Sequence, residues 1–179
     1  MKVVISGGGT GGHVFPAIAI ADAIRRQLPS ADVLFVGAKG KLEMEKVPAA
    51  GYRIIGLDIA GMQRRLTLKN LLLPVKVLRS LIQARTIVSD FRPDVAVGVG
   101  GYASGPLLKV CSWMGVPYVL QEQNSYAGVT NKILGKKAKK VFVAYEGMDK
   151  FFDKNKIQWT GNLIGSWIVE SNMIAEEDR

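Results

Sequence analysis

The sequence predicts an α/β protein of the Rossmann type, with a doubly wound and mostly parallel sheet. Short runs of β-branched and apolar residues alternate along the chain with segments of helical pattern, which is typical of repeated βα units. Several of the runs end in loops unusually rich in glycine. With 179 residues, 48% of them hydrophobic, the chain is large enough to bury one core, and we expect a single domain.

The predicted elements follow one another in regular order. Strands are expected at residues 3–6, 33–36, 53–57, 95–99, 118–120 and 141–143, and helices at 16–28, 42–49, 68–89, 105–114, 128–134 and 145–152. Ligands on such sheets bind outside the carboxyl ends of the strands. We therefore expect the functional site in the loops after the first, fourth and fifth strands.

The composition restricts the class of protein. A formal charge of +9 indicates an anionic partner, whether nucleotide, phospholipid surface or nucleic acid. Cys111 is the only cysteine, which excludes a disulfide framework and a cysteine zinc cluster and suits the cytosol. The N-terminus lacks a signal-peptide pattern, and no apolar stretch reaches the length of a membrane span. Any membrane contact is expected to be peripheral.

The loop at residues 7–13 brings the backbone close to a ligand and precedes a helix, so it suits a phosphate or a sugar hydroxyl. It is not a Walker A motif. Gly7, Gly9 and Gly12 fit the dinucleotide fingerprint, but Lys39 follows the second strand where an acidic ribose ligand is expected. A nicotinamide-dependent oxidoreductase is therefore the weaker alternative, and a purely structural tight turn is another.

Polar side chains in two of these loops are candidates for chemistry. His13 is the only histidine, and the start of the first helix should lower its pKa and keep it neutral, ready to act as a base or to orient a hydroxyl. Glu122 can accept a proton, and Asn124 can bind a sugar edge, the latter being the stronger candidate for direct contact. The structural alternative for His13 is to close the helix entry. For the stretch with Glu122 and Asn124 it is hydrogen bonding within the loop and capping of the helix after Gly128.

The second glycine loop, residues 100–106, suits an anionic acceptor group. Gly100 and Gly101 allow close backbone approach, and Ser104 is expected to cap the next helix. These two glycines, Tyr102 and Ser104 form the predicted acceptor site.

A basic and strongly apolar segment is predicted to contact a membrane. No acidic residue occurs from Ile59 to Ser89, where arginines and lysines alternate with leucines. One apolar face must pack on the sheet, and packing alone remains the alternative to partial contact with anionic lipid. The predicted membrane patch comprises Leu71, Leu72, Val75, Lys76, Arg79 and Trp113.

Three loops in order, at residues 8–13, 100–106 and 122–124, resemble the N-terminal domain of glycosyltransferase family 28, over about residues 1–162. The resemblance implies one half of a GT-B fold and an inverting enzyme that requires no metal or other cofactor. It further implies transfer of N-acetylglucosamine from UDP-N-acetylglucosamine to the C4 hydroxyl of the undecaprenyl-linked muramyl pentapeptide. This step of peptidoglycan synthesis takes place peripherally, at the cytoplasmic face of the bacterial membrane, and involves no nucleic acid.

The resemblance also assigns residues. Thr10, Gly11, Gly12 and Asn124 would touch the donor, and His13 would be the candidate base. The acceptor diphosphate would face Gly100, Gly101 and Tyr102.

Two departures from the family pattern limit the expected activity. Gln121 stands where the family usually has histidine, and Leu163–Ser166 replaces a segment whose arginine contacts the donor. Residues 163–179 form an unassigned tail, and the C-terminal donor domain is expected to be a missing partner. We expect a domain that binds but does not turn over alone, or alternatively a non-catalytic module that binds lipid acceptor or membrane and needs a separate donor domain.

Overall fold

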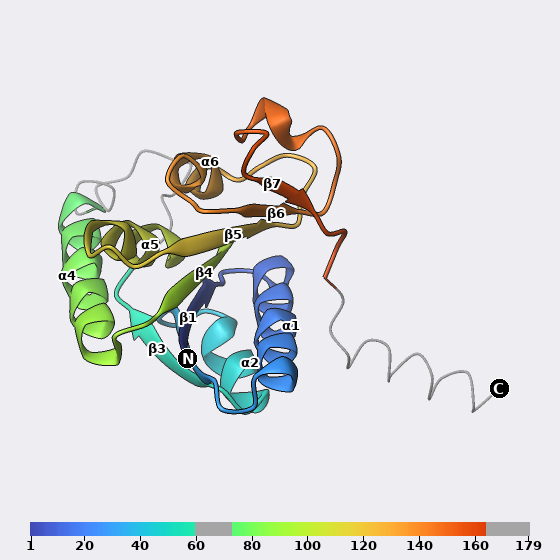
Figure 1. Ribbon diagram of the computed structural model, residues 1–179. Coiled ribbons are helices and arrows are strands. Elements are labelled where there is room, and N and C mark those ends of the chain that lie inside the picture. The colour runs from blue at the N-terminus through green and yellow to red at the C-terminus, as the bar shows by residue number, and fades with distance from the viewer. Residues whose placement is uncertain (60–72, 164–179) are drawn as a thin grey trace.

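A computed structural model describes residues 1–59 and 73–163 (Figure 1). The strands are β1 (Lys2–Gly7), β2 (Asp32–Ala38), β3 (Arg53–Leu57), β4 (Val95–Gly100), β5 (Tyr118–Glu122), β6 (Val141–Val143) and β7 (Ile157–Trp159). The helices are α1 (Gly11–Gln27), α2 (Glu43–Ala49), α4 (Leu73–Phe91), α5 (Ser104–Trp113) and α6 (Val129–Gly135), with a short 3-10 helix, η1 (Met148–Lys150).

The strands form one parallel sheet in the order β3-β2-β1-β4-β5-β6-β7. This order confirms the predicted Rossmann-like class, and all six predicted strands are present. Two details differ from the prediction. The segment 145–152 forms only η1, which begins after Gly147 in the left-handed conformation (φ 70°), and β7 was not predicted. Three residues, two of them exposed, give no readable strand pattern for β7.

The sheet separates two apolar layers. Successive residues of a strand point to opposite faces, so Val3 and Ile5 pack with Val14 and Ala17 of α1, whereas Val4 packs with the α4–α5 layer. Helices α1 and α2 thus cover one face, and α4, α5 and α6 cover the other (Figure 1). Cys111 lies in the α5 layer, where burial raises the pKa of its thiol to about 12.

The change of face between α1 and α5 defines the position of the site. Strands β1 and β4 are neighbours, yet the helices that follow them lie on opposite faces of the sheet. Beyond the end of the sheet the chain leaves these two strands towards opposite faces, and doubly wound sheets bind ligands in the crevice at such a point. The pairing of β1 with β4 is irregular at this point, between Ser6 and Gly7.

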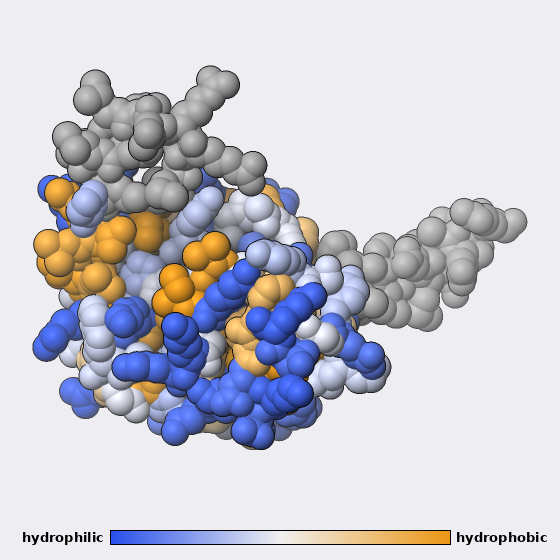
Figure 2. All heavy atoms as spheres, turned by 90° about the horizontal axis from the view of Figure 1, so that it is seen from above, coloured by the Kyte–Doolittle hydropathy of each residue, from blue (hydrophilic) through white to orange (hydrophobic). Residues whose placement is uncertain are grey.

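The exposed surface of α4 carries apolar side chains. Val75, Leu78 and Ile82 recur at spacings of three and four residues and are 48%, 59% and 60% exposed, so they form one stripe on the helix. Figure 2 shows apolar side chains gathered over this helix at the left of the view. Trp113 of α5 is exposed as well. Leu71 and Leu72, two members of the predicted membrane patch, lie outside the described residues. Among the described helices, none combines the length and apolar character needed to cross a bilayer.

Packing of β4 against α5 predicts that one methyl group added at Gly98 lowers the stability of the fold. A Cβ at Gly98 would overlap Leu108 and lie 2.9 Å from Leu120 Cδ2, whereas a Cβ at Gly105 would meet only Thr130 Cγ2 at 3.7 Å. We expect Gly98→Ala to lower the free energy of unfolding by about 1–3 kcal/mol. Gly105→Ala, the matched control on α5, should leave it unchanged or raise it by up to about 1 kcal/mol. Urea denaturation of both variants checks this, and equal midpoints would contradict the packing argument.

Candidate functional site

The two glycine loops touch each other at the crevice. The amide of Gly8 donates to the carbonyl of Gly100 at 3.2 Å. Gly100 and Gly101 both have positive φ, 107° and 90°, which favours glycine. A Cβ at Gly101 would overlap the Gly8 carbonyl, and one at Gly100 would lie 2.6 Å from Cδ2 of His13. Glycine is therefore required at both positions by direct contact with the first loop.

His13 lies in the first turn of α1, with its ring against the second loop. Its Nδ1 is 3.1 Å from the Thr10 hydroxyl, and the ring also hydrogen-bonds to the Gly8 backbone. Burial lowers the pKa of the imidazole, and the nearby carboxylates of Glu122 and Glu43 oppose this only in part. The predicted direction of the shift is therefore correct, but the cause is desolvation rather than the helix terminus. A neutral ring can accept a proton.

Glu43 organises the first loop and was missed by the sequence reasoning. Its side chain is fully buried at the start of α2, and its two oxygens accept from the amides of Gly9 at 2.8 Å and Ala38 at 2.9 Å. A Cβ at Gly8 or Gly37 would overlap this carboxylate. Because its side chain is fully buried and holds two backbone amides, Glu43 is not exposed to a ribose, although it lies just after the second strand.

Glu122 closes the other side of the crevice at the end of β5. Its Oε1 accepts from the backbone and side-chain amides of Asn124, at 3.1 and 2.9 Å, and its Oε2 accepts from the Gly128 amide and Asn131 Nδ2, both at 3.0 Å. These contacts match the alternative of hydrogen bonding within the loop, because four donors hold the carboxylate, whereas no side chain caps α6. A role for Glu122 as a base remains a prediction that these contacts do not favour.

Asn131 is a second polar residue that sequence reasoning missed. Its Nδ2 is fixed by Glu122 and by the Gln121 carbonyl, so its Oδ1 is the remaining polar atom, and this atom has no hydrogen-bond partner among the described residues. Both side-chain amide atoms of Gln121 and Oε1 of Gln123 are likewise buried and unpartnered within that part of the chain. The only available signal was an asparagine at the start of a short predicted helix, which also suits simple capping.

These elements enclose a cavity of about 430 Å³ at the crevice. Its walls come from both glycine loops, from the start of α6 and from the loop before α2. The lining residues are Gly8, Gly9, Thr10, His13, Lys41, Gly100, Gly101, Tyr102, Glu122, Gly128, Val129, Thr130 and Asn131. The N-termini of α1 and α5 and the cation of Lys41 favour an anionic group here.

The structure brings together most, but not all, of the predicted site. Six predicted residues line the cavity: Thr10, His13, Gly100, Gly101, Tyr102 and Glu122. Gly11, Gly12 and Asn124 are not part of the lining, and the two glycines begin α1.

The prediction that Ser104 caps the next helix is wrong. Ser104 is fully buried, and its hydroxyl lies 2.9 Å from the carbonyls of both Ser6 and Gly100, so it fastens β1 to β4, and its place in the acceptor site stays a prediction. It is also the first residue of α5, with Ala103 at the capping position, and no side chain caps that helix.

The lowered pKa of His13 predicts a pH dependence of stability. The folded pKa lies below the unfolded value of about 6.5, so the unfolded chain binds a proton more readily. Stability is therefore complete above about pH 6.5 and decreases as the pH falls towards the folded pKa. NMR titration of the single imidazole, with denaturation at several pH values, measures both effects. His13→Gln should remove this part of the pH dependence, and a folded pKa above 6.5 would contradict the assignment.

The contacts of Glu43 predict that its carboxylate stabilises the fold. In Glu43→Gln, one of the two backbone amides faces an NH₂ group and loses its acceptor, so we expect a loss of about 1–3 kcal/mol in unfolding free energy. The NMR resonances of the Gly9 and Ala38 amides should shift in the same variant. Glu45→Gln, on the exposed side of the same helix, is the matched control and should leave stability and both resonances unchanged. Equal stability of the two variants would refute this role.

Comparison with known proteins identifies the family. The model for the glycosyltransferase family 28 N-terminal domain matches residues 3–143. A relative from Phocaeicola vulgatus is 55% identical over 177 residues, covering 99% of this chain and 47% of the relative. One from Bacteroides thetaiotaomicron is 60% identical over 164 residues, covering 92% of this chain and 44% of the relative. Both are named UDP-N-acetylglucosamine–N-acetylmuramyl-(pentapeptide) pyrophosphoryl-undecaprenol N-acetylglucosamine transferase.

Solved structures agree with this result. The crystal structure of Acinetobacter baumannii MurG superposes with a TM-score of 0.76 at 29% identity, over 89% of this chain and 45% of that one. A UDP-N-acetylglucosamine 2-epimerase, at 14% identity and a TM-score of 0.65, shares the fold alone. The chain spans about half the length of the curated relatives it matches. It belongs to glycosyltransferase family 28, whose N-terminal domain it contains.

Proposed function

We propose that this chain is the acceptor-binding half of an enzyme that transfers N-acetylglucosamine from UDP-N-acetylglucosamine to the C4 hydroxyl of undecaprenyl-pyrophosphoryl-muramyl pentapeptide. The named relatives support the reaction and its substrates. The observation that carries the proposal for this chain is the cavity in which a neutral His13 lies between two glycine loops. Because the relatives are about twice as long, turnover is assigned to the complete enzyme and not to these residues alone.

In this proposal His13 acts as the base. The C4 hydroxyl gives its proton to the imidazole while its oxygen bonds to the anomeric carbon of the donor sugar. The bond from that carbon to the diphosphate oxygen breaks at the same time, UDP leaves with the electron pair, and the configuration inverts. Burial favours this role, because it keeps the ring unprotonated near neutral pH. The Thr10 hydroxyl beside Nδ1 fixes the orientation of the ring.

The acceptor diphosphate is assigned to the side of the cavity formed by the second glycine loop. Gly100, Gly101 and Tyr102 line that side, and the N-terminus of α5 and Lys41 supply positive potential. The donor is assigned to Gly11, Gly12 and Asn124. Their position outside the cavity lining suits a donor that is held mainly by the other half of the enzyme.

The exposed surface of α4 is proposed to meet the membrane. The exposed apolar stripe of α4, Lys76 and Arg79 beside it, and the exposed Trp113 suit a peripheral contact with anionic lipid at the cytoplasmic face. Such a contact would bring the lipid-linked acceptor to the crevice without a membrane-spanning helix.

A chimera provides the test of the proposed function. We would fuse this chain to the remaining half of the Bacteroides thetaiotaomicron relative and measure sugar transfer to a soluble, short-chain acceptor analogue. His13→Ala should lower kcat about 10²–10⁴-fold, since it removes the base. Binding of the same analogue to the unfused chain should change less than about threefold, because His13 acts mainly in the transition state.

Each other outcome has a definite meaning. Full activity of the His13→Ala chimera would refute the base assignment. Transfer by the unfused chain at the rate of the chimera would refute its role as one half of the enzyme. A chimera that binds the analogue but transfers nothing would favour the non-catalytic binding module.

A further inference from the structure

The loop between β2 and α2, residues 39–42 (loop 39–42), carries a lysine to the cavity of the candidate site. Lys41 lines that cavity and is the only lysine or arginine among the described residues that do so. Its side chain is exposed and has no hydrogen bond or ion pair with another residue of the described ranges. Gly40 before it has a φ of 68°, which favours glycine. The position of this cation therefore depends on what holds the loop.

The end of loop 39–42 at α2 is held by Glu43 and Leu42. The buried carboxylate of Glu43 accepts from backbone amides of the first glycine loop and of β2. Leu42 packs against the apolar layer of α1, and the Lys41 carbonyl accepts from the Met44 amide at 3.0 Å. The backbone on the C-terminal side of Lys41 is thus fixed.

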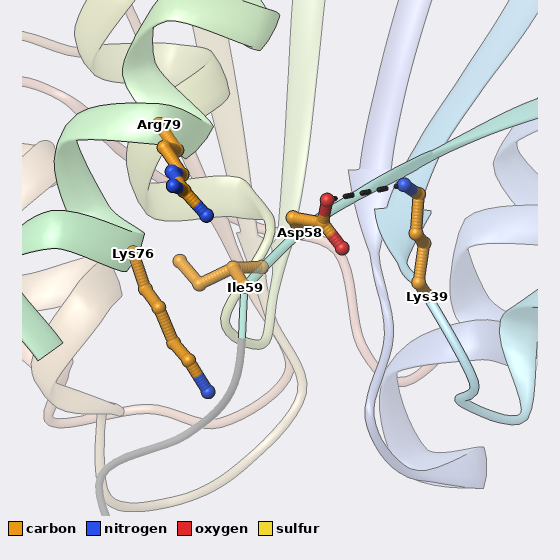
Figure 3. A pocket seen from close by; sticks show the side chains of 5 residues that line it. All are labelled: Lys39, Asp58, Ile59, Lys76 and Arg79. Carbon is orange, nitrogen blue, oxygen red and sulfur yellow. Dashed lines mark hydrogen bonds and ion pairs between the residues drawn. The ribbon is translucent and has the colours of Figure 1, made fainter. Parts of the chain in front are cut away.

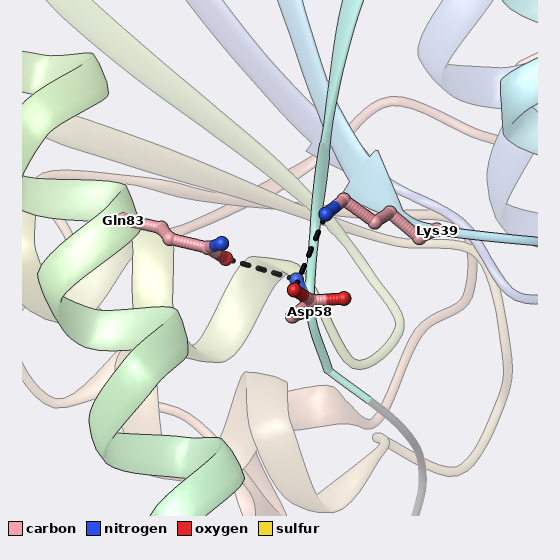
Figure 4. Close-up of polar contacts among 3 residues, drawn as sticks. All are labelled: Lys39, Asp58 and Gln83. Atoms are coloured by element: carbon pink, nitrogen blue, oxygen red, sulfur yellow. Dashed lines mark hydrogen bonds and ion pairs between the residues drawn. The ribbon is translucent and has the colours of Figure 1, made fainter.

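The other end of loop 39–42 is held by Lys39. Its amide donates to the Leu57 carbonyl at 3.0 Å, and its Nζ lies 3.2 Å from Oδ2 of Asp58 (Figure 3). The Asp58 amide in turn donates to Oε1 of Gln83 on α4 at 2.9 Å (Figure 4). A Cβ at Gly56 would lie 2.8 Å from Cγ of Lys39, so glycine there lets the lysine stem cross β3. Both the stem and the charge of Lys39 are therefore tied to the end of β3.

The carboxylate of Asp58 pairs with this loop although α4 carries other cations nearby. Asp58 and Lys39 lie on one side of a second cavity, of about 330 Å³, and Lys76 and Arg79 extend from α4 on the other side (Figure 3). Among the described residues, Lys39 is the only ion-pair partner of Asp58. The ion pair therefore joins the ends of two neighbouring strands beside the candidate site, rather than a strand to the helix.

We propose that Asp58 is a positioning residue for the candidate site, which holds loop 39–42 through Lys39 so that Lys41 binds the diphosphate of the acceptor. Lys41 can form charge-assisted hydrogen bonds only where its Nζ reaches the phosphate oxygens. A loop that is ordered before binding lowers the entropy cost of that contact. The acceptor is favoured as the source because Lys41 shares the cavity with the second glycine loop. Because the ligand belongs to the proposed acceptor, this role of Asp58 rests on the proposed function.

The experiment uses the chimera, with the soluble acceptor analogue as its substrate. Lys41→Gln should raise KM for the analogue about tenfold or more, since it removes charge-assisted hydrogen bonds. Asp58→Asn should raise the same KM about two- to fivefold, because the ion pair that it removes is half exposed. In both variants the effect should fall on KM for the acceptor and not on kcat. UDP carries the same chemical group, so a rise confined to KM for UDP-N-acetylglucosamine would overturn the acceptor as the source.

Two single variants separate positioning from general loosening of the sheet. The ion pair of Asp32 with Arg53 joins the same two strands at their opposite ends, away from the cavity. Asp32→Asn is therefore the matched control and should leave KM for the analogue unchanged. Asp58→Glu keeps the negative charge and should restore most of the affinity that Asp58→Asn loses. An equal rise of KM in Asp58→Asn and Asp32→Asn would overturn the positioning role.

A double variant tests whether Asp58 acts through Lys41. In the Lys41→Gln background, Asp58→Asn should change KM by less than about 1.5-fold, because the cation that the loop positions is gone. Effects that multiply would show two independent residues and would overturn the inference.

Failure of this inference differs from failure of the proposed function. If His13→Ala lowers kcat while Lys41→Gln leaves KM unchanged, the role of loop 39–42 is wrong and the proposed function stands. If the chimera transfers nothing, the same variants are compared by ¹H–¹⁵N NMR titration of the unfused chain with the analogue. Kd should then rise in Lys41→Gln and, less, in Asp58→Asn, and an unchanged Kd in both would overturn the inference.

Discussion

The contact between the two glycine loops is the constraint on which the site depends. At the point where β1 and β4 send their chains to opposite faces, the Gly8 amide bonds to Gly100, and Gly101 lies directly against the Gly8 carbonyl. No side chain fits between the loops, so the backbones form the floor of the cavity. His13 packs on this floor and owes its burial to it, and that burial lowers the pKa of the imidazole.

Two buried carboxylates lie near His13, Glu43 of α2 and Glu122 at the end of β5. Glu43 binds amides of the first loop and of β2, and Glu122 binds amides of the loop before α6 together with Asn131. Both also act on His13 through space, where their negative charges favour the protonated ring. Desolvation is nevertheless the larger effect, because the net shift of the pKa is downward. The carboxylates therefore position the loops without converting His13 into a permanent cation.

The sequence predicts the fold better than it predicts the polar contacts of the site. Buried parallel strands and the glycine loops after them have local signatures, so the six strands and the two glycine loops of the cavity were found. Ser104 was wrongly assigned as a helix cap because Ser-Gly-Pro resembles a capped helix start, whereas its hydroxyl bonds to the Ser6 carbonyl, 98 residues away. Glu43 was missed for the same reason. Nothing near it in sequence indicates that its partner is a glycine of another loop, and such contacts appear only when the chain is folded.

The two walls of the cavity differ in polarity, and this difference favours one orientation of the proposed acceptor. One wall consists of glycine-loop backbone and the start of α5, with Lys41 nearby, and suits a diphosphate. On the other wall Asn131 Nδ2 donates to Glu122 Oε2 and to the Gln121 carbonyl, so Oδ1 of Asn131 is left as an acceptor without a partner among the described residues. That wall suits hydroxyl or amide hydrogens and disfavours an anion, because Glu122 is already there. A sugar diphosphate has both kinds of group, and with the sugar towards Glu122 and the diphosphate towards Gly101, a sugar hydroxyl would lie beside His13.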